Sequence, residues 1–172
     1  MPTYVCSAAV GRLTPAQKAE IVDNITTIHH EETGAPRYLV LVIFHDLAPG
    51  SCYLGGRPAP ADQIWIRGDI RSGRTNEQKS QMLRRIMHDV GRASGATEDA
   101  VWVYLSDLPA ENLTEYGRIL PPPGKEEAWL SSLPDATREK LMCGPDKGTH
   151  ISRFRDGWSR STLTGRAGTA GA

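Results

Sequence analysis

The residue that follows the initiator methionine is a proline, and this position gives the chain an unusual chemical group. Initiator methionine is normally removed when the next residue is small, so we expect the mature chain to begin with the secondary amine of Pro2. An α-amino group in a model peptide has a pKa of about 7.7–8.0, close enough to neutrality to donate or accept a proton. Nearby cations and burial lower such a pKa, whereas carboxylates raise it. Pro2 is therefore a candidate general acid or general base.

Two arginines in one predicted loop are candidates for holding a carboxylate. Arg71 and Arg74 flank a Ser-Gly pair, where the glycine lets the backbone turn tightly. The planar guanidinium fork matches a carboxylate bidentately, and two forks three residues apart can converge on one anion. The alternative is that both are ordinary solvated surface arginines.

Three further side chains have the right chemistry, although each also has an ordinary structural explanation. Tyr104 lies in an apolar predicted strand, where tyrosine usually packs. Glu115 precedes a Tyr-Gly pair and could act as a base or be a solvated loop acid. His29 lies near the end of the apolar helical stripe formed by Ile21, Val22, Ile25 and Ile28, where a histidine is often satisfied locally.

An internal repeat organises the elements that must position these residues. Shifting the sequence by 61 positions without a gap gives ten identities over residues 14–47, and it aligns Pro2 with Gln63. Both halves, 2–47 and 63–108, show a strand, a helix and a second apolar strand. The expected strands are Thr3 to Ala9, Arg37 to His45, Gln63 to Ile70 and Ala100 to Ser106. The first expected helix has Thr14 as its N-cap and Pro15 as its first residue, and it ends at Gly34. The second begins at Thr75, ends near Gly95 and carries Met82, Leu83, Ile86 and Val90.

Two β-α-β units predict a mixed α/β (α+β) fold. Strands joined through a helix lie parallel with a right-handed crossover, and two such units can share a four-stranded sheet with both helices on one face. An exposed apolar sheet face is a liability, so we expect subunit association to cover the other face. Residues 1–143 are the expected domain, with a helical pattern over 126–142, and 144–172 is expected to be a flexible tail rich in Gly, Ser, Thr and Arg.

Composition excludes several classes of function. Twenty basic and twenty acidic residues balance, which gives no indication of a nucleic-acid partner. No apolar run is long enough for a membrane span and no signal peptide is apparent, so we expect a cytoplasmic protein. Cys6, Cys52 and Cys143 are scattered, and the histidines are not paired at a ligand spacing, so we predict free thiols and no metal.

Taken together, these residues resemble the cis-3-chloroacrylic acid dehalogenase family of the tautomerase superfamily, from Pro2 to about Met142. The most specific stretches are Ile28-His29-His30, Leu54-Gly55-Gly56, Gly68 to Arg74, Trp102-Val103-Tyr104, and Glu115 to Pro121. The resemblance implies the β-α-β-β-α-β tautomerase fold and a homotrimer. It carries over six functional positions, all present here: Pro2, His29, Arg71, Arg74, Tyr104 and Glu115.

The resemblance implies hydration of a short α,β-unsaturated carboxylate without a cofactor. Arg71, Arg74 and His29 would hold the carboxylate, Glu115 with Tyr104 would activate water, and Pro2 would protonate C2; cis-3-chloroacrylate would give malonate semialdehyde. Thr33, Trp102, Arg118 and Leu120 are possible pocket residues. Two alternatives stay open: a tautomerase acting on 2-hydroxydienoates or arylpyruvate enols with Pro2 as base, and a non-catalytic binding protein on the same fold.

Overall fold

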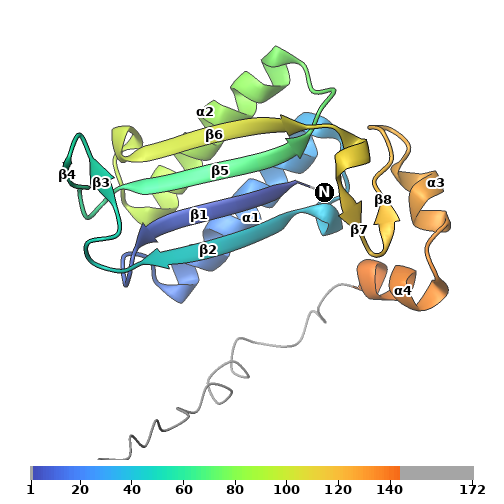
Figure 1. The fold of residues 1–172 in the computed structure, drawn as a ribbon, viewed down its shortest axis with the longest axis horizontal. Coiled ribbons are helices and arrows are strands. Elements are labelled where there is room, and N and C mark those ends of the chain that lie inside the picture. The colour runs from blue at the N-terminus through green and yellow to red at the C-terminus, as the bar shows by residue number, and fades with distance from the viewer. Residues whose placement is uncertain (1, 144–172) are drawn as a thin grey trace, which may run out of the picture.

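The computed structural model describes residues 2–143, in which a four-stranded β-sheet packs against two long helices and two short hairpins form separate two-stranded sheets (Figure 1). The expected tail over 144–172 lies outside the described residues. The elements in chain order are β1 (Thr3–Ala9), α1 (Pro15–Thr33), β2 (Leu41–Leu47), β3 (Tyr53–Leu54), β4 (Arg57–Pro58), β5 (Ile64–Arg71), α2 (Asn76–Ser94), β6 (Val101–Leu108), β7 (Thr114–Glu115), β8 (Arg118–Ile119), α3 (Glu126–Ser131) and α4 (Asp135–Cys143). No helix among these residues is long and apolar enough to cross a membrane.

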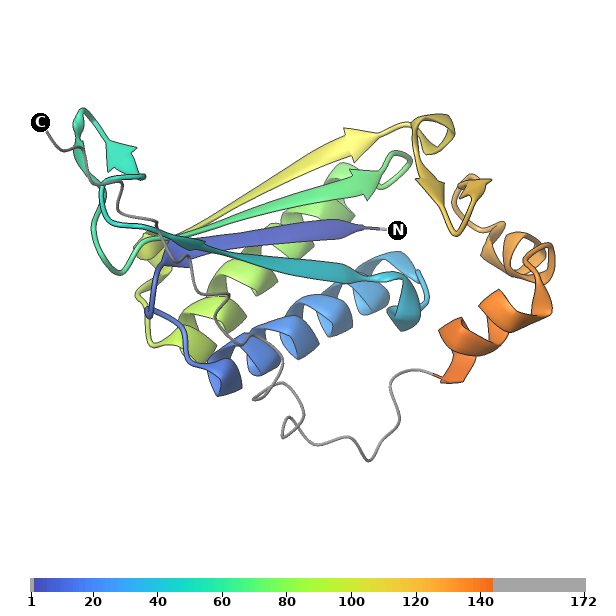
Figure 2. The same ribbon diagram turned by 60° about the horizontal axis from the view of Figure 1, so that its bottom comes forward.

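The main sheet has the order β2-β1-β5-β6, and each outer strand is parallel to the inner strand of its own unit. The two inner strands, β1 and β5, pair antiparallel and join the two units. Figure 2 shows α1 and α2 together on one face of this sheet. The predicted pair of β-α-β units, with a shared sheet and both helices on one side, is confirmed.

Matching interactions in the two units show the repeat in three dimensions. Each helix begins with a capping box, in which the threonine side chain accepts a hydrogen bond from a backbone amide and a glutamine side chain bonds back: Thr14 with Gln17, and Thr75 with Gln78. Each helix ends at a glycine with φ of 71°, a left-handed conformation that glycine adopts at low cost. Ion pairs at equivalent positions tie each helix to its second strand, Lys18 to Asp46 at 2.8 Å and Lys79 to Asp107 at 2.7 Å.

The strand register corrects one detail of the sequence alignment. Thr3 pairs with Leu41 in the first unit, and Trp65 pairs with Trp102 in the second. Because Leu41 and Trp102 are 61 residues apart, Thr3 corresponds to Trp65, at an offset of 62. Pro2 therefore corresponds to Ile64 rather than Gln63. The loop before α2 is one residue shorter than the loop before α1, a change that an ungapped comparison cannot detect.

Three predicted boundaries also differ. The chain over Arg37–Leu39 forms a 3-10 turn before β2, and Glu98–Ala100 does the same before β6, so both strands start later than predicted. The pattern over 126–142 is two helices, α3 and α4, because Pro134 lies between them and lacks an amide hydrogen to continue a helix.

One member of the apolar stripe predicted for the first helix is not part of its buried face. In α1, Val22 is 36% exposed, whereas Ile21, Ile25 and Ile28 are buried.

The core lies between the sheet and the two helices. Its largest fully buried side chains include Tyr4, Ile21, Ile25, Ile28, Ile64, Ile66, Ile70, Met82, Ile86 and Val90. The ring of Tyr4 packs over Gly68, its pairing partner on β5. Glycine is required at this position because a Cβ there would lie 2.5 Å from the ring. The close approach of strand and ring fixes where the tyrosine hydroxyl points.

The sheet face opposite the helices carries large apolar side chains that remain exposed in one chain. They include Ile43 of β2 at 37%, Trp102 of β6 at 37% and Tyr104 of β6 at 52%. No helix covers this face in the described part of the chain (Figure 2). A solvent-exposed sheet face of this kind is typical of a surface that packs against another subunit.

Candidate active site

One end of the sheet brings together side chains from four parts of the chain. Because β1 and β5 are antiparallel, the start of β1 lies at the end of β5: Thr3 pairs with Asp69, so Pro2 lies level with Ile70, beside Arg71. The end of α1 brings His29 to the same edge. The β7–β8 hairpin, which carries Glu115, lies beside the N-terminus in both Figure 1 and Figure 2.

Pro2 is buried and is held by the neighbouring strand. Its carbonyl oxygen accepts a hydrogen bond of 3.0 Å from the backbone amide of Leu41. The pyrrolidine ring adds no rotatable side-chain torsion, so its nitrogen is fixed relative to the sheet. This is the geometry that a terminal amine needs to exchange protons with a substrate in a fixed position.

His29 is 2% exposed, and Tyr4 determines which of its nitrogens carries the proton. The Tyr4 hydroxyl lies 2.9 Å from Nδ1 of His29. Burial, followed by the charge of Arg74, lowers the pKa of His29 to about 3, so the ring is neutral. Among the described residues the Tyr4 hydroxyl has no other hydrogen-bond partner, and both groups are satisfied when it donates to Nδ1. The proton of the neutral ring is then on Nε2, which leaves an N–H donor on the far side of the ring.

Arg71, the last residue of β5, is 5% exposed and is held by the segment that follows the repeat. It donates to the carbonyl oxygen of Pro121 at 2.5 Å and to the carboxylate of Glu126. Burial acts to raise the pKa of Glu126, but hydrogen bonds from Arg71 and from the backbone outweigh it and lower the pKa below its usual range. Arg71 and Glu126 are therefore an ionised pair.

Arg74 differs from Arg71 in having no carboxylate in ion-pair contact among the described residues. Its Nε is buried and has no hydrogen-bond partner among residues 2–143. Burial and then the neighbouring charge of Arg71 lower the pKa of Arg74. The preceding Gly73 has φ of 102°, a left-handed conformation that lets the loop turn, and a Cβ at this position would lie 3.4 Å from the ring of Pro123. A buried donor without a hydrogen-bond partner is a candidate group for binding an anionic ligand.

Glu115 is the last residue of β7 and pairs in register with Arg118 of β8. The turn between them contains Tyr116 with φ of 50° and Gly117 with φ of 75°. Burial and then the charge of Glu115 raise the pKa of Tyr116. The other predicted pocket residues near this end have structural contacts: the Thr33 hydroxyl donates to the carbonyl oxygen of His29 at 2.6 Å, and Leu120 is 5% exposed in a second apolar cluster.

Tyr104 and Trp102 are not brought to this cluster within one chain. Tyr104 pairs with Arg67, four residues before the end of β6, where Leu108 pairs with Arg71. At about 3.3 Å per residue, Tyr104 is about 13 Å along the strand from Arg71. Its ring instead packs edge-on against Trp65, with centroids 5.9 Å apart, on the open face of the sheet.

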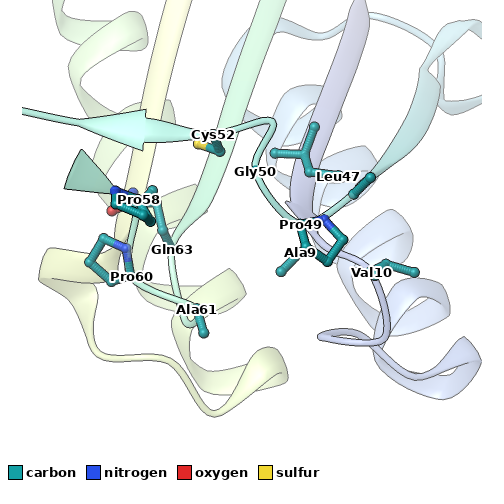
Figure 3. Close-up of a pocket in the computed structure, with 12 residues that line it drawn as sticks. Ala9, Val10, Leu47, Pro49, Gly50, Cys52, Pro58, Pro60, Ala61 and Gln63 are labelled. Carbon is teal, nitrogen blue, oxygen red and sulfur yellow. The ribbon is translucent and has the colours of Figure 1, made fainter. Parts of the chain in front are cut away.

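A further cavity lies at the opposite end of the sheet and lacks this chemistry (Figure 3). Its volume is about 330 Å³, and alanine and proline side chains dominate its lining. By the two-fold relation of the repeat it is the counterpart of the Pro2 end, but Ala9 stands where the other end has Arg71, and Leu13 stands where it has Arg74. The two positions that carry Arg71 and Arg74 at the Pro2 end are therefore occupied by uncharged residues at the other end.

Sequence reasoning missed Tyr4 and Glu126. Strand alternation places Tyr4 on the buried face of β1, which was a usable signal, because a buried tyrosine hydroxyl needs a partner. Glu126 gave no local signal, since only the folded chain brings it to Arg71, 55 residues earlier. Among the described residues, no group of three or more His, Cys, Asp or Glu side chains could hold a metal ion.

Comparison with known proteins agrees with this architecture. A family model described as "Putative oxalocrotonate tautomerase enzyme" matches residues 1–132. The crystal structure of N1, a member of the cis-3-chloroacrylic acid dehalogenase family, is 44% identical with a TM-score of 0.78, covering 81% of this chain and 98% of that one.

Two further proteins are similar in a more limited way. A probable tautomerase from Streptococcus mutans is 29% identical over 55 residues, covering 32% of this chain and 90% of that protein, so it is about as long as one repeat. The F6 fused 4-OT asymmetric trimer shares the fold, at 21% identity and a TM-score of 0.63 over 68% of this chain and 94% of that one. The chain belongs to the cis-3-chloroacrylic acid dehalogenase family of the tautomerase superfamily.

Proposed function

We propose that the chain is a cofactor-independent enzyme that adds water to short α,β-unsaturated carboxylates, with loss of halide where C3 carries one. The observation that supports this most directly is the meeting of the Pro2 end of β1 with two arginines, a neutral histidine and the Glu115 hairpin. The set contains a proton donor, an anion site and a base, which are the groups that such a hydration needs.

The proposed reaction begins with the substrate carboxylate held by Arg71 and Arg74, with Nε2–H of His29 as a further donor. These donors draw electron density toward the carboxylate and make C3 electrophilic. Glu115 removes a proton from water as its oxygen bonds to C3, and the ammonium form of Pro2 delivers a proton to C2. With cis-3-chloroacrylate the resulting chlorohydrin loses chloride and a proton to give malonate semialdehyde, which balances the addition of one water.

A trimer explains how Tyr104 could reach the site. In one chain this side chain lies on the open sheet face, about 13 Å along the strand from Arg71. The fused 4-OT protein, which shares this fold, is a trimer. We propose that three copies of this chain pack through their open faces, and that Tyr104 of one subunit completes the site of its neighbour. Trp102, exposed on the same strand, would form part of the same wall.

A tautomerase is the second candidate, and the unmatched Arg74 favours it. Guanidinium groups disfavour an ammonium beside them, whereas Glu115 favours it. If the arginines dominate, Pro2 is neutral and acts as a base, moving a proton between carbon and oxygen in a 2-hydroxydienoate or an arylpyruvate enol. The same residues then bind the substrate, but Glu115 loses its role in activating water.

One pair of assays separates these functions. Chloride release and malonate semialdehyde formation from cis-3-chloroacrylate are measured beside ketonisation of phenylenolpyruvate, using untagged protein whose N-terminal Pro2 is verified by mass spectrometry. The variants are Pro2→Ala and Glu115→Gln, with Glu111→Gln as a matched control because Glu111 is exposed on the same segment. We expect dehalogenation that is lost in the first two variants and kept in the control.

Other results point elsewhere. Ketonisation that needs Pro2 but not Glu115, without dehalogenation, would favour the tautomerase. Inactivity in both assays would contradict the hydration of haloacrylates and leave the non-catalytic binding role.

The shared site has its own test. Pro2→Ala and Tyr104→Phe protomers are prepared separately, then dissociated and reassociated as a mixture. If Tyr104 acts across the interface, mixed trimers contain sites with both wild-type residues, and activity rises above that of either variant. No recovery in trimers shown to be mixed would place Tyr104 within its own subunit or outside the reaction.

A further inference from the structure

The buried contact between Arg71 and Glu126 joins two parts of the chain that carry different halves of the proposed site. Arg71 ends β5 in the repeat, whereas Glu126 begins α3 in the segment after it. Both side chains are largely buried, at 5% and 15% exposure. A buried ion pair is costly to break from one side, because the remaining charge is left without a partner. The contact therefore fixes both groups.

The segment that Glu126 belongs to also carries Glu115. Besides the ion pair, this segment is held by an apolar cluster in which Leu39, just after α1, packs with Leu120, Trp129, Leu133 and Leu141. Trp129 donates from its indole nitrogen to the carbonyl oxygen of Ile119 at 3.0 Å, which ties α3 to the β7–β8 hairpin. Glu126 thus links Arg71, at the end of β5, to the β7–β8 hairpin that carries the proposed base Glu115.

The same contact makes the two arginines unequal. The charge of Arg71 is matched by Glu126, and two of its five N–H donors are used on Glu126 and Pro121. Arg74 has no matching carboxylate, and its buried Nε has no partner among residues 2–143. The charge of Glu126 nevertheless reaches Arg74 at a distance, where it opposes the larger effects of burial and of Arg71 on that side chain's pKa.

We propose that Glu126 is a positioning residue of the active site, which locks Arg71 against the Glu115-bearing segment and leaves Arg74 as the guanidinium that takes most of the charge of the substrate carboxylate. This inference rests on the proposed function for its ligand class, a small monocarboxylate. It assigns Glu126 two separable effects: its charge weakens anion binding at the site, and its position supports turnover.

Glu126→Gln separates the two effects, because glutamine keeps an oxygen acceptor for Arg71 while the negative charge is removed. Glu127→Gln is the matched control: it makes the same charge change at the next residue of α3, where the side chain is exposed. Propanoate serves as the probe, as a saturated carboxylate that binds without reacting. We expect its Kd to fall about threefold or more in Glu126→Gln, with kcat for cis-3-chloroacrylate lower, and both unchanged in Glu127→Gln.

Glu126→Asp gives the complementary result. It keeps the charge but shortens the side chain, so we expect a propanoate Kd close to wild type and a lower kcat. A merely structural role would lower kcat and the melting temperature of both Glu126 variants together while leaving the propanoate Kd of the folded fraction unchanged, and this would overturn the inference. Failure of the wild-type protein to bind propanoate would instead refute the carboxylate site of the proposed function itself.

Discussion

Acidification should destabilise the protein through His29 in a way that a single substitution removes. Burial, and then Arg74, lowers the pKa of the ring to about 3, against about 6.5 in an unfolded chain. The unfolded chain therefore binds this proton more readily, so the stability is complete above about pH 6.5 and is lost as the pH falls toward 3. Each pH unit in that window costs about 1.4 kcal/mol, which amounts to about 2.5 kcal/mol between pH 7 and pH 4.5.

The assay is urea unfolding followed by tryptophan fluorescence at both pH values, at one fixed protein concentration. Carboxylates such as Glu126, whose lowered pKa also makes acid destabilising, contribute to every variant, so the quantity of interest is a difference. Relative to wild type, His29→Gln should lose about 2.5 kcal/mol less on acidification. His88→Gln, a change at an exposed position, should follow wild type. Parallel losses in wild type and His29→Gln would refute the assignment of a buried neutral ring.

Three other predictions concern the framework of the site. Tyr4→Phe removes the donor to Nδ1 of His29 and should lower the free energy of unfolding by about 1–3 kcal/mol in the urea assay. If His29 donates to the substrate through Nε2, kcat/KM should fall as well. An unchanged free energy of unfolding together with unchanged turnover would contradict this prediction. Gly68→Ala would place a Cβ 2.5 Å from the ring of Tyr4 and 2.8 Å from Leu105, so we expect the free energy of unfolding to fall by about 1–3 kcal/mol in the same assay. A variant as stable as wild type would show that β5 can shift to accommodate the methyl group without cost. Thr75→Ala removes the cap of α2 and should cost about 1 kcal/mol, whereas Thr75→Ser should restore it.

Local chemistry was enough to predict the architecture. Both helices begin at a Thr-x-x-Gln sequence, end at a glycine and have apolar residues at helical spacing, and all of these features depend on contacts within a few residues. The structure has the capping boxes and the left-handed glycines at the positions that these patterns predict. The parallel pairing within each unit followed from the crossover rule. The predicted register and strand boundaries were wrong where short segments without periodicity connect the elements. These segments are the two strand–helix loops, which differ in length by one residue, and the 3-10 turns before β2 and β6.

The sequence by itself determined which chemical groups the chain contains and, through the repeat, which strands, helices and loops carry Pro2, His29, Arg71 and Arg74; the antiparallel pairing of β1 with β5, which brings these groups to one edge of the sheet, came from the structure. Only the tertiary structure decided how they are held. Tyr4 orients His29 because the two side chains meet in the core, and Glu126 holds Arg71 across 55 residues of chain. Such contacts depend on packing between elements, which has no periodic signature in the sequence. The place of Tyr104 on the open sheet face, away from the charged cluster, is likewise a consequence of strand register that residue type alone does not reveal.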